Sequence, residues 1–219
     1  MANIDCLRQL LMATIVSLFV ALAAAAIAEK CIPVRHVIDG DTIVLGNGDR
    51  IRYLGINTPE IAYGDSPGEL LGDQARQLNI QLVENKDIYL EYGEHRRDRY
   101  GRHLAFVYDC RTGRFVNATL LEKGYGYLLT NGLTGTRIER MLAAQQTAIR
   151  YRRGIWETLQ GKKLPVDIFG NRRSMKMHRL RCTSGGKTSR HNRVTLPSVM
   201  SGFKEGYAPC KVCLHDILK

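Results

Sequence analysis

Acidic residues are scarce in this sequence beside basic ones. Its 219 residues include 21 Asp and Glu against 32 Lys and Arg, a formal net charge of +11 and a pI near 9.6. The imbalance excludes no fold, but it favours a polyanionic partner, because a basic protein neutralises many phosphates and releases their counterions. A generic basic surface would give the same charge, so charge alone does not identify nucleic acid as the partner.

Long apolar runs are also scarce, and the one that stands out lies near the N-terminus. Residues 10–28 carry no charge, Arg8 precedes them, and Ala26-Ile27-Ala28 forms a small-x-small cleavage site. This pattern predicts a signal peptide over residues 1–28, cleaved after Ala28. The alternative is an uncleaved anchor, since ~19 apolar residues can just span a bilayer. We therefore expect an exported protein, periplasmic or extracellular, without stable membrane association after cleavage.

Cysteines are few, and their number in the exported chain is odd. Of the six cysteines, Cys6 lies in the predicted signal peptide, so five remain. Export places these five in an oxidising compartment, where disulfides persist. Five cysteines cannot all pair with one another, so at least one has another purpose.

Five strands are predicted from short β-branched and aromatic runs, over residues 33–38, 42–45, 50–55, 87–92 and 103–108. Asn47-Gly48 is typical of a tight hairpin turn between the second and third strands. Ser66, Pro67 and Glu69 predict the start of a helix between the third and fourth strands. Two further helices are expected, over residues 117–123 and from residue 136 to Gly154. This order predicts an α+β fold, a five-stranded OB-fold barrel with three helices.

The composition changes after Ile155-Trp156, and a second unit is expected there. We predict an OB-fold domain over residues 29–160, a basic linker over residues 161–175, and a small Cys/His-stapled module over residues 176–219.

Two candidate clusters follow the first and third strands. Ile38-Asp39-Gly40-Asp41-Thr42 places two carboxylates at a glycine turn, and hard oxygen ligands of this kind suit Ca²⁺ or Mg²⁺. A turn in which Asp caps its own backbone would show the same pattern. The second cluster runs from Arg52 to Glu60, with Asn57 and the Thr58 carbonyl as further oxygen ligands and Glu60 as a proton acceptor.

A third cluster, Arg97-Asp98-Arg99-Tyr100-Gly101-Arg102, precedes the fifth strand. Arginine presents a planar fork to phosphate oxygens, and Tyr100 could stack on a base. A solvated charged loop is the alternative for this motif taken by itself.

Taken together, the motifs IDGDT, RYLGINTPE, DRYGR and GIW resemble the staphylococcal nuclease (thermonuclease) family, in the family's order, over residues 38–156. The resemblance implies that Asp41, Asn57 and Thr58 hold calcium. It also implies that Glu60 is the general base for an attacking water. Arg52 and Arg102 would then clamp the phosphate, and Tyr100, with Tyr127 nearby, would contact the nucleotide.

The sequence departs from the family pattern in one metal ligand. The staphylococcal enzyme has an aspartate where this sequence has Asn57, which implies weaker calcium binding. The aromatic that helps to bind the nucleotide in that enzyme falls at Thr130 by counting from Arg102. The resemblance therefore does not itself assign base stacking to Tyr127.

The C-terminal residues carry a separate signature, namely His178-x-x-x-Cys182 and Cys210-x-x-Cys213. One His and three Cys suit a tetrahedral structural Zn²⁺. The segment resembles Cys-rich modules at the C-terminus of some secreted nucleases. If these three cysteines bind zinc, the two left over, Cys31 and Cys110, can form a disulfide. The alternative is a disulfide-bonded tail with one stray thiol.

The hypothesis we favour is a monomeric, secreted, calcium-dependent endonuclease that hydrolyses DNA and RNA phosphodiesters. One alternative is a catalytically inactive OB-fold module that only binds nucleic acid or protein. Against it, Arg52, Glu60 and Arg102 are all present. Another is a metal-free ribonuclease that would use two of the histidines His36, His95 and His103.

Overall fold

The structure is a computed structural model that describes residues 12, 15–16 and 30–218 of the chain. The predicted signal peptide, residues 1–28, lies almost wholly outside the described residues. Within the described ranges, no helix is both long and apolar enough to cross a membrane.

The first half of the chain forms a closed barrel of five strands in the order β1-β2-β3-β6-β5. The strands are β1 (Ile32–Val37), β2 (Thr42–Leu45), β3 (Arg50–Tyr53), β5 (Asp87–Arg97) and β6 (His103–Asp109). Only β3 and β6 pair in parallel; the other neighbours are antiparallel. Alternating apolar side chains such as Val37, Ile43 and Ile51 are fully buried inside it. The predicted α+β barrel of OB type is confirmed.

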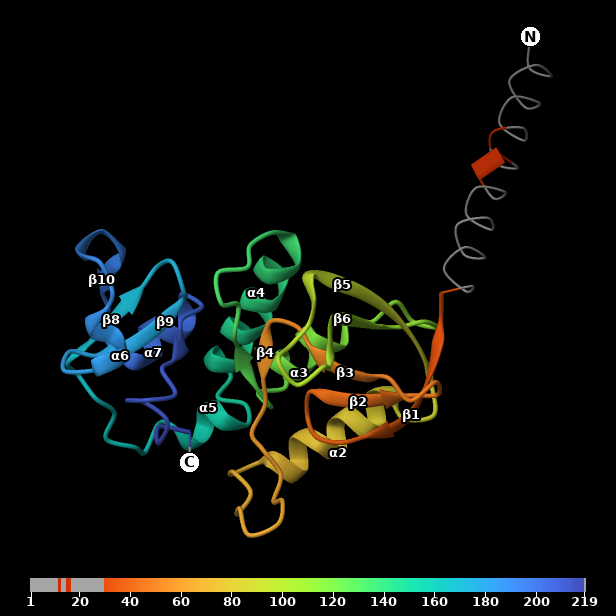
Figure 1. Ribbon diagram of the computed structural model, residues 1–219, viewed down its shortest axis with the longest axis horizontal. Helices are drawn as coiled ribbons and strands as arrows, with labels where there is room; N and C mark the ends of the chain where they lie inside the picture. Colours follow the sequence, from red (N-terminus) through yellow and green to blue (C-terminus); the bar gives the residue numbers. More distant parts are fainter. Residues whose placement is uncertain (1–11, 13–14, 17–29, 219) are drawn as a thin grey trace.

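Three longer helices pack against the barrel core, and their positions can be followed in Figure 1. They are α2 (Gly72–Val83), α3 (Val116–Glu122) and α4 (Thr136–Arg150), and a short helix, α5 (Ile155–Thr158), follows α4. A two-residue strand, β4 (Ile56–Asn57), leaves the barrel and pairs antiparallel with β7 (Tyr127–Leu128), so that the chain after α3 lies beside the loop after β3.

The start of α2 differs from the prediction, because the helix begins at Gly72 rather than at Pro67. Ser66 exchanges backbone hydrogen bonds with Tyr63, and the Glu69 amide donates to the Glu60 carbonyl. The Glu69 carboxylate in turn accepts from the Glu60 amide at 3.1 Å. The apparent capping residues therefore fold a loop back onto Glu60.

The C-terminal residues form a second sheet in the order β10-β8-β9-β11. Its strands are β8 (Ile168–Asn171), β9 (Lys176–Arg179), β10 (Arg193–Thr195) and β11 (Ala208–Pro209). Between them lie α6 (Thr183–Gly186), the 3-10 helix η1 (Arg190–Asn192) and α7 (Val199–Lys204). The predicted linker over residues 161–175 must be shortened, because β8 lies within it and pairs with both β9 and β10.

The C-terminal module shares a hydrophobic core with α4 and α5. The Trp156 ring is fully buried and meets the edge of Phe203 from α7 at 4.9 Å between centroids. Gln145 of α4 donates to the Phe203 carbonyl, and its own side-chain oxygen accepts from the Leu128 amide. Because the C-terminal module buries Trp156, the module and the barrel region form one folded body.

The Gly-Ile-Trp motif is explained by a close approach of two glycines. A Cβ on Gly124 would lie 2.1 Å from the Arg153 carbonyl oxygen, and a Cβ on Gly154 would lie 2.3 Å from the Gly124 carbonyl oxygen. The Ile155 amide donates to that same Gly124 carbonyl at 3.0 Å. The pair lets the chain after α3 touch the end of α4 and places Trp156 in the shared core.

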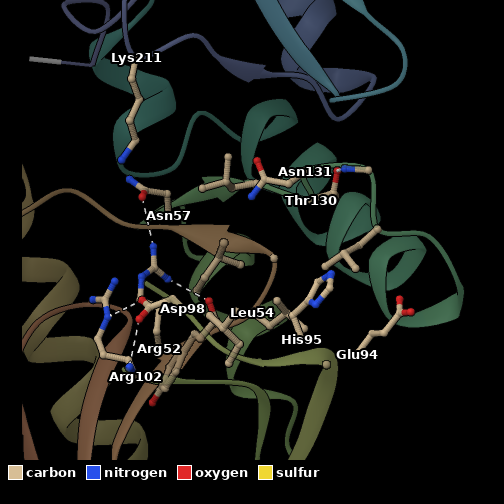
Figure 2. Close-up of a pocket in the computed structure, with 18 residues that line it drawn as sticks. Arg52, Leu54, Asn57, Glu94, His95, Asp98, Arg102, Thr130, Asn131 and Lys211 are labelled. Carbon is tan, nitrogen blue, oxygen red and sulfur yellow. Dashed lines mark hydrogen bonds and ion pairs between the residues drawn. The ribbon is translucent and has the colours of Figure 1, made fainter. Parts of the chain in front are cut away.

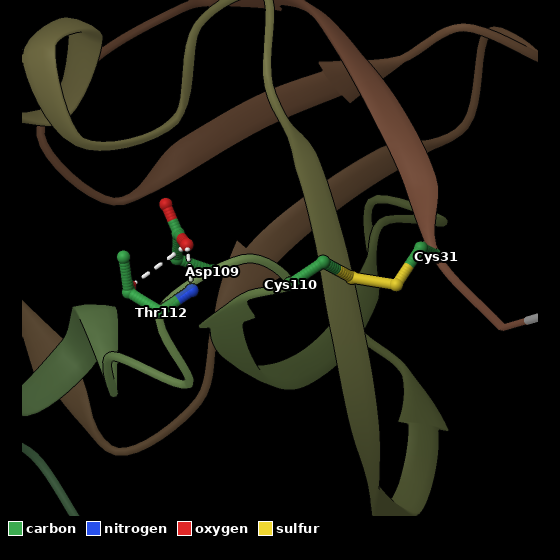
Figure 3. Close-up of a disulfide and its surroundings, with 4 residues drawn as sticks. All are labelled: Cys31, Asp109, Cys110 and Thr112. Carbon is green, nitrogen blue, oxygen red and sulfur yellow. Dashed lines mark hydrogen bonds between the residues drawn. A yellow bond between two sulfur atoms is a disulfide. The ribbon is translucent and has the colours of Figure 1, made fainter. Parts of the chain in front are cut away.

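A disulfide joins Cys31 to Cys110, with the two Cα atoms 6.3 Å apart (Figure 3). It ties the residue before β1 to the turn after β6, across a sequence separation of 79 residues. Closing a loop of this length in the unfolded chain stabilises the fold by about 4.5 kcal/mol in the chain-entropy view. The bonded pair is the one expected if the other three cysteines bind a metal.

Candidate active site

The turn between β1 and β2 brings two carboxylates against the loop after β4. A Cβ on Gly40 would lie 2.6 Å from the Thr58 hydroxyl, so only glycine lets the turn approach so closely. The Asp41 amide donates to the Asp39 carboxylate at 2.9 Å, which holds the turn in shape. The Asp-Gly-Asp spacing therefore has a packing reason as well as a chemical one.

Arg52 of β3 links the predicted calcium ligands. Its Nη2 lies 2.9 Å from Asp41 Oδ2 and donates to Asn57 Oδ1 at 3.1 Å. Asp41 Oδ2 also accepts from the Thr58 amide at 2.9 Å, and Asn57 Nδ2 donates to the Thr58 carbonyl at 3.1 Å. The structure thus brings the oxygens of Asp41, Asn57 and Thr58 together in one network beside one arginine.

Asp41 is 4% exposed and stands among like charges. Burial raises the pKa of this carboxyl to about 7, against the opposing charge of Arg52, and the charge of Asp39 adds to the rise. The family resemblance assigned only Asp41 to the metal, although the Asp-x-Asp spacing offers Asp39 as a second carboxylate. A buried carboxylate with acidic neighbours and one arginine is an electrostatically unfavourable group that a cation would stabilise.

Glu60 lies near Asp39 and Arg52, and its side chain is exposed to solvent. The protein around it reduces its hydration and raises the pKa of the carboxyl, and Asp39 raises it further, while Arg52 and Lys211 oppose the rise. Its backbone is fixed from both sides by Glu69, as described above. A carboxylate so placed is suited to accept a proton from water near the metal ligands.

Arg102 approaches from the turn before β6. Its Nε binds Asp98 Oδ2 at 2.8 Å, and its Nη1 reaches the Thr42 hydroxyl at 3.5 Å. Tyr100 is exposed, and the Arg102 guanidinium lies 5.5 Å from its ring centroid. Arg102 and Tyr100 therefore lie on one exposed turn, and Arg102 reaches β2 at the edge of the carboxylate turn.

A cavity of about 520 Å³ lies between the two arginines of this region and the strand β4, and Figure 2 shows the residues around it. Arg52, Asn57 and Arg102 line it, with Thr130 and Asn131 on the opposite wall. Lys211 from the C-terminal module also lines this cavity, and in Figure 2 its side chain extends toward Asn57. Sequence reasoning did not find Lys211, since nothing in its local pattern connects it with β4.

A smaller adjoining cavity of about 230 Å³ is lined by Asn57, Glu60, Tyr127 and Lys211. Tyr127 is 7% exposed, and its ring meets the edge of Phe203. Burial raises the pKa of its hydroxyl, and the charge of Glu69 raises it further. Its ring is part of the shared core.

The three histidines of the metal-free alternative do not meet at this site. His36 lies near Glu84 and His103 near Asp49, each at 3.6 Å. Of the three, only His95 lines the larger cavity. A reaction that needs two histidines is therefore not supported by the described residues.

The four C-terminal ligand candidates lie together. One ligand atom each from His178, Cys182, Cys210 and Cys213 falls within 4.8 Å of all the others. Cys182 Sγ and Cys210 Sγ are 4.0 Å apart, close to the edge of about 3.8 Å expected for a tetrahedron with ~2.3 Å zinc–sulfur bonds. A disulfide would need ~2.05 Å between the sulfurs.

His178 supports a metal rather than a thiol network. Its Nδ1 is buried and has no hydrogen-bond partner among the described residues. Burial lowers the pKa of the imidazole, and the charge of Lys176 lowers it further, so the ring is neutral, the form that binds metals. The donor set and the geometry fit a closed four-ligand zinc site, without a free position for catalysis.

Comparison with known proteins identifies the class to which this fold and site belong. The family described as "Staphylococcal nuclease homologue" matches residues 50–158. A thermonuclease of Staphylococcus hyicus is 30% identical over 131 residues, covering 58% of this chain and 76% of the relative. The chain belongs to the staphylococcal nuclease family. This confirms the predicted family and, with it, the predicted enzyme class, a hydrolase of phosphodiesters.

Two further relatives support the assignment. A thermonuclease of Staphylococcus intermedius is 32% identical over 130 residues, covering 57% of this chain and 74% of the relative. Endonuclease YncB of Bacillus subtilis (strain 168) is 43% identical over 93 residues, covering 41% of this chain and 43% of the relative. The matched family region ends at residue 158, before the C-terminal module begins.

Proposed function

We propose that this protein is an exported, calcium-dependent nuclease that hydrolyses phosphodiester bonds in DNA and RNA. The observation that carries the proposal is the network that joins Asp41, Asn57 and Thr58 to Arg52. Arg102 lines the same cavity as Arg52 and Asn57, and Glu60 lines the adjoining one. The oxygen-only donor set suits a hard cation, and calcium is the ion that the family resemblance implies. The relatives named thermonuclease and endonuclease support the nuclease activity.

Calcium held by Asp41, Asn57 and the Thr58 carbonyl would neutralise negative charge on the phosphate. Arg52 and Arg102 add positive charge on the same side, and both are pre-oriented by carboxylate partners, Asp41 and Asp98. Preorganised cations of this kind stabilise the charge that develops at phosphorus.

Glu60 has the role of general base. Its carboxylate accepts a proton from water as the water oxygen bonds to phosphorus. The ester bond from phosphorus to the leaving oxygen then breaks, and that oxygen takes up a proton from solvent. General-base catalysis of this kind contributes a factor of about 10²–10⁴ in rate.

The test is turnover on single-stranded DNA and RNA, with calcium and with EGTA, for the native protein and for Glu60→Gln. We expect activity that is lost in EGTA, restored by calcium, and reduced at least ~10²-fold by Glu60→Gln. The matched control is Glu122→Gln, a carboxylate paired with Arg153 away from the site, which should retain full turnover. Equal turnover in EGTA, or in Glu60→Gln, would contradict the proposal. Nucleic acid bound but not cut would point to the inactive binding module.

We also propose that the C-terminal cluster binds one structural Zn²⁺. The donor types of His178 and the three cysteines and their spacing support it, and a metal of this kind adds stability to a small module. Metal analysis of the purified protein should give one zinc per chain, and Cys213→Ser should lose it. A protein without zinc that contains a second disulfide would leave a disulfide-stapled module instead.

Export is proposed on two grounds. The disulfide between Cys31 and Cys110 is of a kind that persists in oxidising compartments, and the uncharged run before it is typical of a signal peptide. N-terminal sequencing of the protein recovered from culture medium or periplasm should begin at Glu29. An intact N-terminus in the membrane fraction would indicate a retained anchor.

A further inference from the structure

Lys211 belongs to the C-terminal module but lies in the cleft of the nuclease domain. It lines both the larger cavity with Arg52 and the smaller one with Glu60. In Figure 2 it reaches down from the module toward Asn57, from the side opposite to Arg102. The two cavities share Asn57 and Lys211, so the lysine lies where they adjoin.

The backbone that carries Lys211 is held firmly by the module. Lys211 follows Cys210, whose amide donates to the Met177 carbonyl at 3.0 Å beside the parallel pairing of β11 with β9. The Leu214 amide donates back to the Cys210 carbonyl at 2.9 Å, and the Leu214 side chain is 1% exposed. Two proposed metal ligands, Cys210 and Cys213, flank this turn, and Leu214 anchors it in the core. The backbone at Lys211 therefore has a defined position.

Lys211 differs from the two arginines of the larger cavity in having no carboxylate bonded to it. Arg52 is paired with Asp41, and Arg102 with Asp98. Among the described residues, no hydrogen bond or ion pair holds the exposed Lys211 side chain. An exposed ammonium that no carboxylate holds in place can adjust to a phosphate beside the reacting one, whereas the arginines held by Asp41 and Asp98 suit the reacting phosphate.

We propose that Lys211 binds a phosphate adjacent to the scissile one in the bound nucleic acid, so that the C-terminal module completes the substrate cleft. The inference rests on the proposed nuclease function. Its chemistry is a contact between an ammonium and a backbone phosphate, which positions the strand without reading its sequence. The module then adds a specific subsite for substrates with more than one phosphate.

The experiment compares Lys211→Ala, Lys211→Arg and Lys187→Ala with the native protein on two substrates. One is a single-stranded oligonucleotide, and the other is a nucleoside nitrophenyl phosphodiester that has only the scissile phosphate. Lys187 is the matched control, because it lies in the same module, is exposed and lines neither cavity. Thermal unfolding and zinc content are measured on each variant to show that the module is intact.

We expect Lys211→Ala to raise KM for the oligonucleotide about 5- to 10-fold, the effect of one charged phosphate contact. The salt dependence of log KM should become shallower by about 0.7, the contribution of one phosphate on a single strand. The loss in kcat/KM should be several-fold larger on the oligonucleotide than on the single-phosphodiester substrate. Lys211→Arg should recover most of the loss, and Lys187→Ala should behave as the native protein.

An equal loss on both substrates would place Lys211 at the scissile phosphate and overturn the inference, as would equal behaviour of Lys211→Ala and Lys187→Ala. Native protein that cuts neither substrate with calcium present would instead overturn the proposed function itself. The two failures are therefore distinguishable in the same set of assays.

Discussion

Replacing Asp41 by asparagine should stabilise the calcium-free protein while abolishing the proposed binding of calcium. Burial of Asp41 is the main cost of its charge, Asp39 and Glu60 add repulsion, and Arg52 offsets only part of the combined cost. Asparagine keeps the size of the side chain and an oxygen that can accept from the Thr58 amide. The charge that the proposed calcium site needs on Asp41 is therefore unfavourable when no cation is bound.

The size of the effect follows from the pKa of Asp41. Burial raises that pKa in the folded protein from 3.8 to about 7, against the opposing charge of Arg52. Because the pKa of Asp41 is higher in the folded than in the unfolded protein, folding takes up a proton at any pH between these two values. The free energy of unfolding therefore falls as pH rises from about 4 to about 7, and stays low above that range. A shift of about three units corresponds to ~4 kcal/mol.

That value is an upper bound, because Arg52 loses its charged partner in the variant. We expect a gain of about 1–3 kcal/mol above neutral pH, which raises Tm by at least ~2 °C in a chain of this size. The assay is thermal unfolding in EDTA from about pH 4 to about pH 8, and the gain should shrink toward the acid end. Both proteins should keep the Cys31–Cys110 disulfide during the measurement.

Asp109 provides the control for this reasoning. Burial works to raise the pKa of its carboxyl, but hydrogen bonds from the Thr112 hydroxyl and amide lower it below its ordinary value. The same substitution there, Asp109→Asn, should destabilise the protein at neutral pH, and the loss should fade as pH falls below the ordinary carboxyl range. An Asp41→Asn protein that is destabilised at every pH would refute the electrostatic argument. It would mean that the lost ion pair with Arg52 outweighs the relief of repulsion at Asp41.

Three further predictions concern the proposed calcium site, the C-terminal module and the two arginines. Asn57→Asp should tighten calcium binding, measured by calorimetry, because a charged oxygen replaces a neutral one on a hard cation; weaker or equal binding would mean that Asn57 is no ligand. Ending the chain after Gly161 should expose Trp156 and Tyr127, so the shortened protein should be unstable or aggregate. Two independent domains would instead leave a stable barrel, so a cooperative thermal transition near that of the full chain would disprove the shared core. Arg52→Ala and Arg102→Ala should each lower turnover at least ~10²-fold. Circular dichroism spectra like that of the native protein would show that each variant is folded. Near-normal turnover in either variant would mean that the replaced arginine does not stabilise the reacting phosphate.

The barrel could be predicted from the sequence because its signals are local. β2 and the start of β3 lie where alternating apolar residues and the Asn47-Gly48 turn place them, and Gly48 has the positive φ of 88° that such a turn requires. The disposition of Asp41, Arg52 and Glu60 also followed from ordered motifs. Local patterns suffice where each element's neighbours are also near in the sequence.

The remaining features depend on partners far along the chain. Ser66 and Glu69 look like helix-capping residues, but their partners are Tyr63 and Glu60, so α2 begins later than predicted. β8 is short and is stabilised by pairing with β9 and β10, which a scan for strong strand signals does not detect. Lys211 reaches the cleft only because the module packs on α4 and α5.

The shared core also sets an order for maturation. A chain that emerges N-terminus first can close its barrel once β6 has appeared, but Trp156 and Tyr127 keep their rings in water until Phe203 arrives. The cleft gains Lys211 later still, after α7 has formed. A partly synthesised chain therefore has a barrel but an unfinished cleft, because the residues that complete the cleft follow the barrel in the sequence.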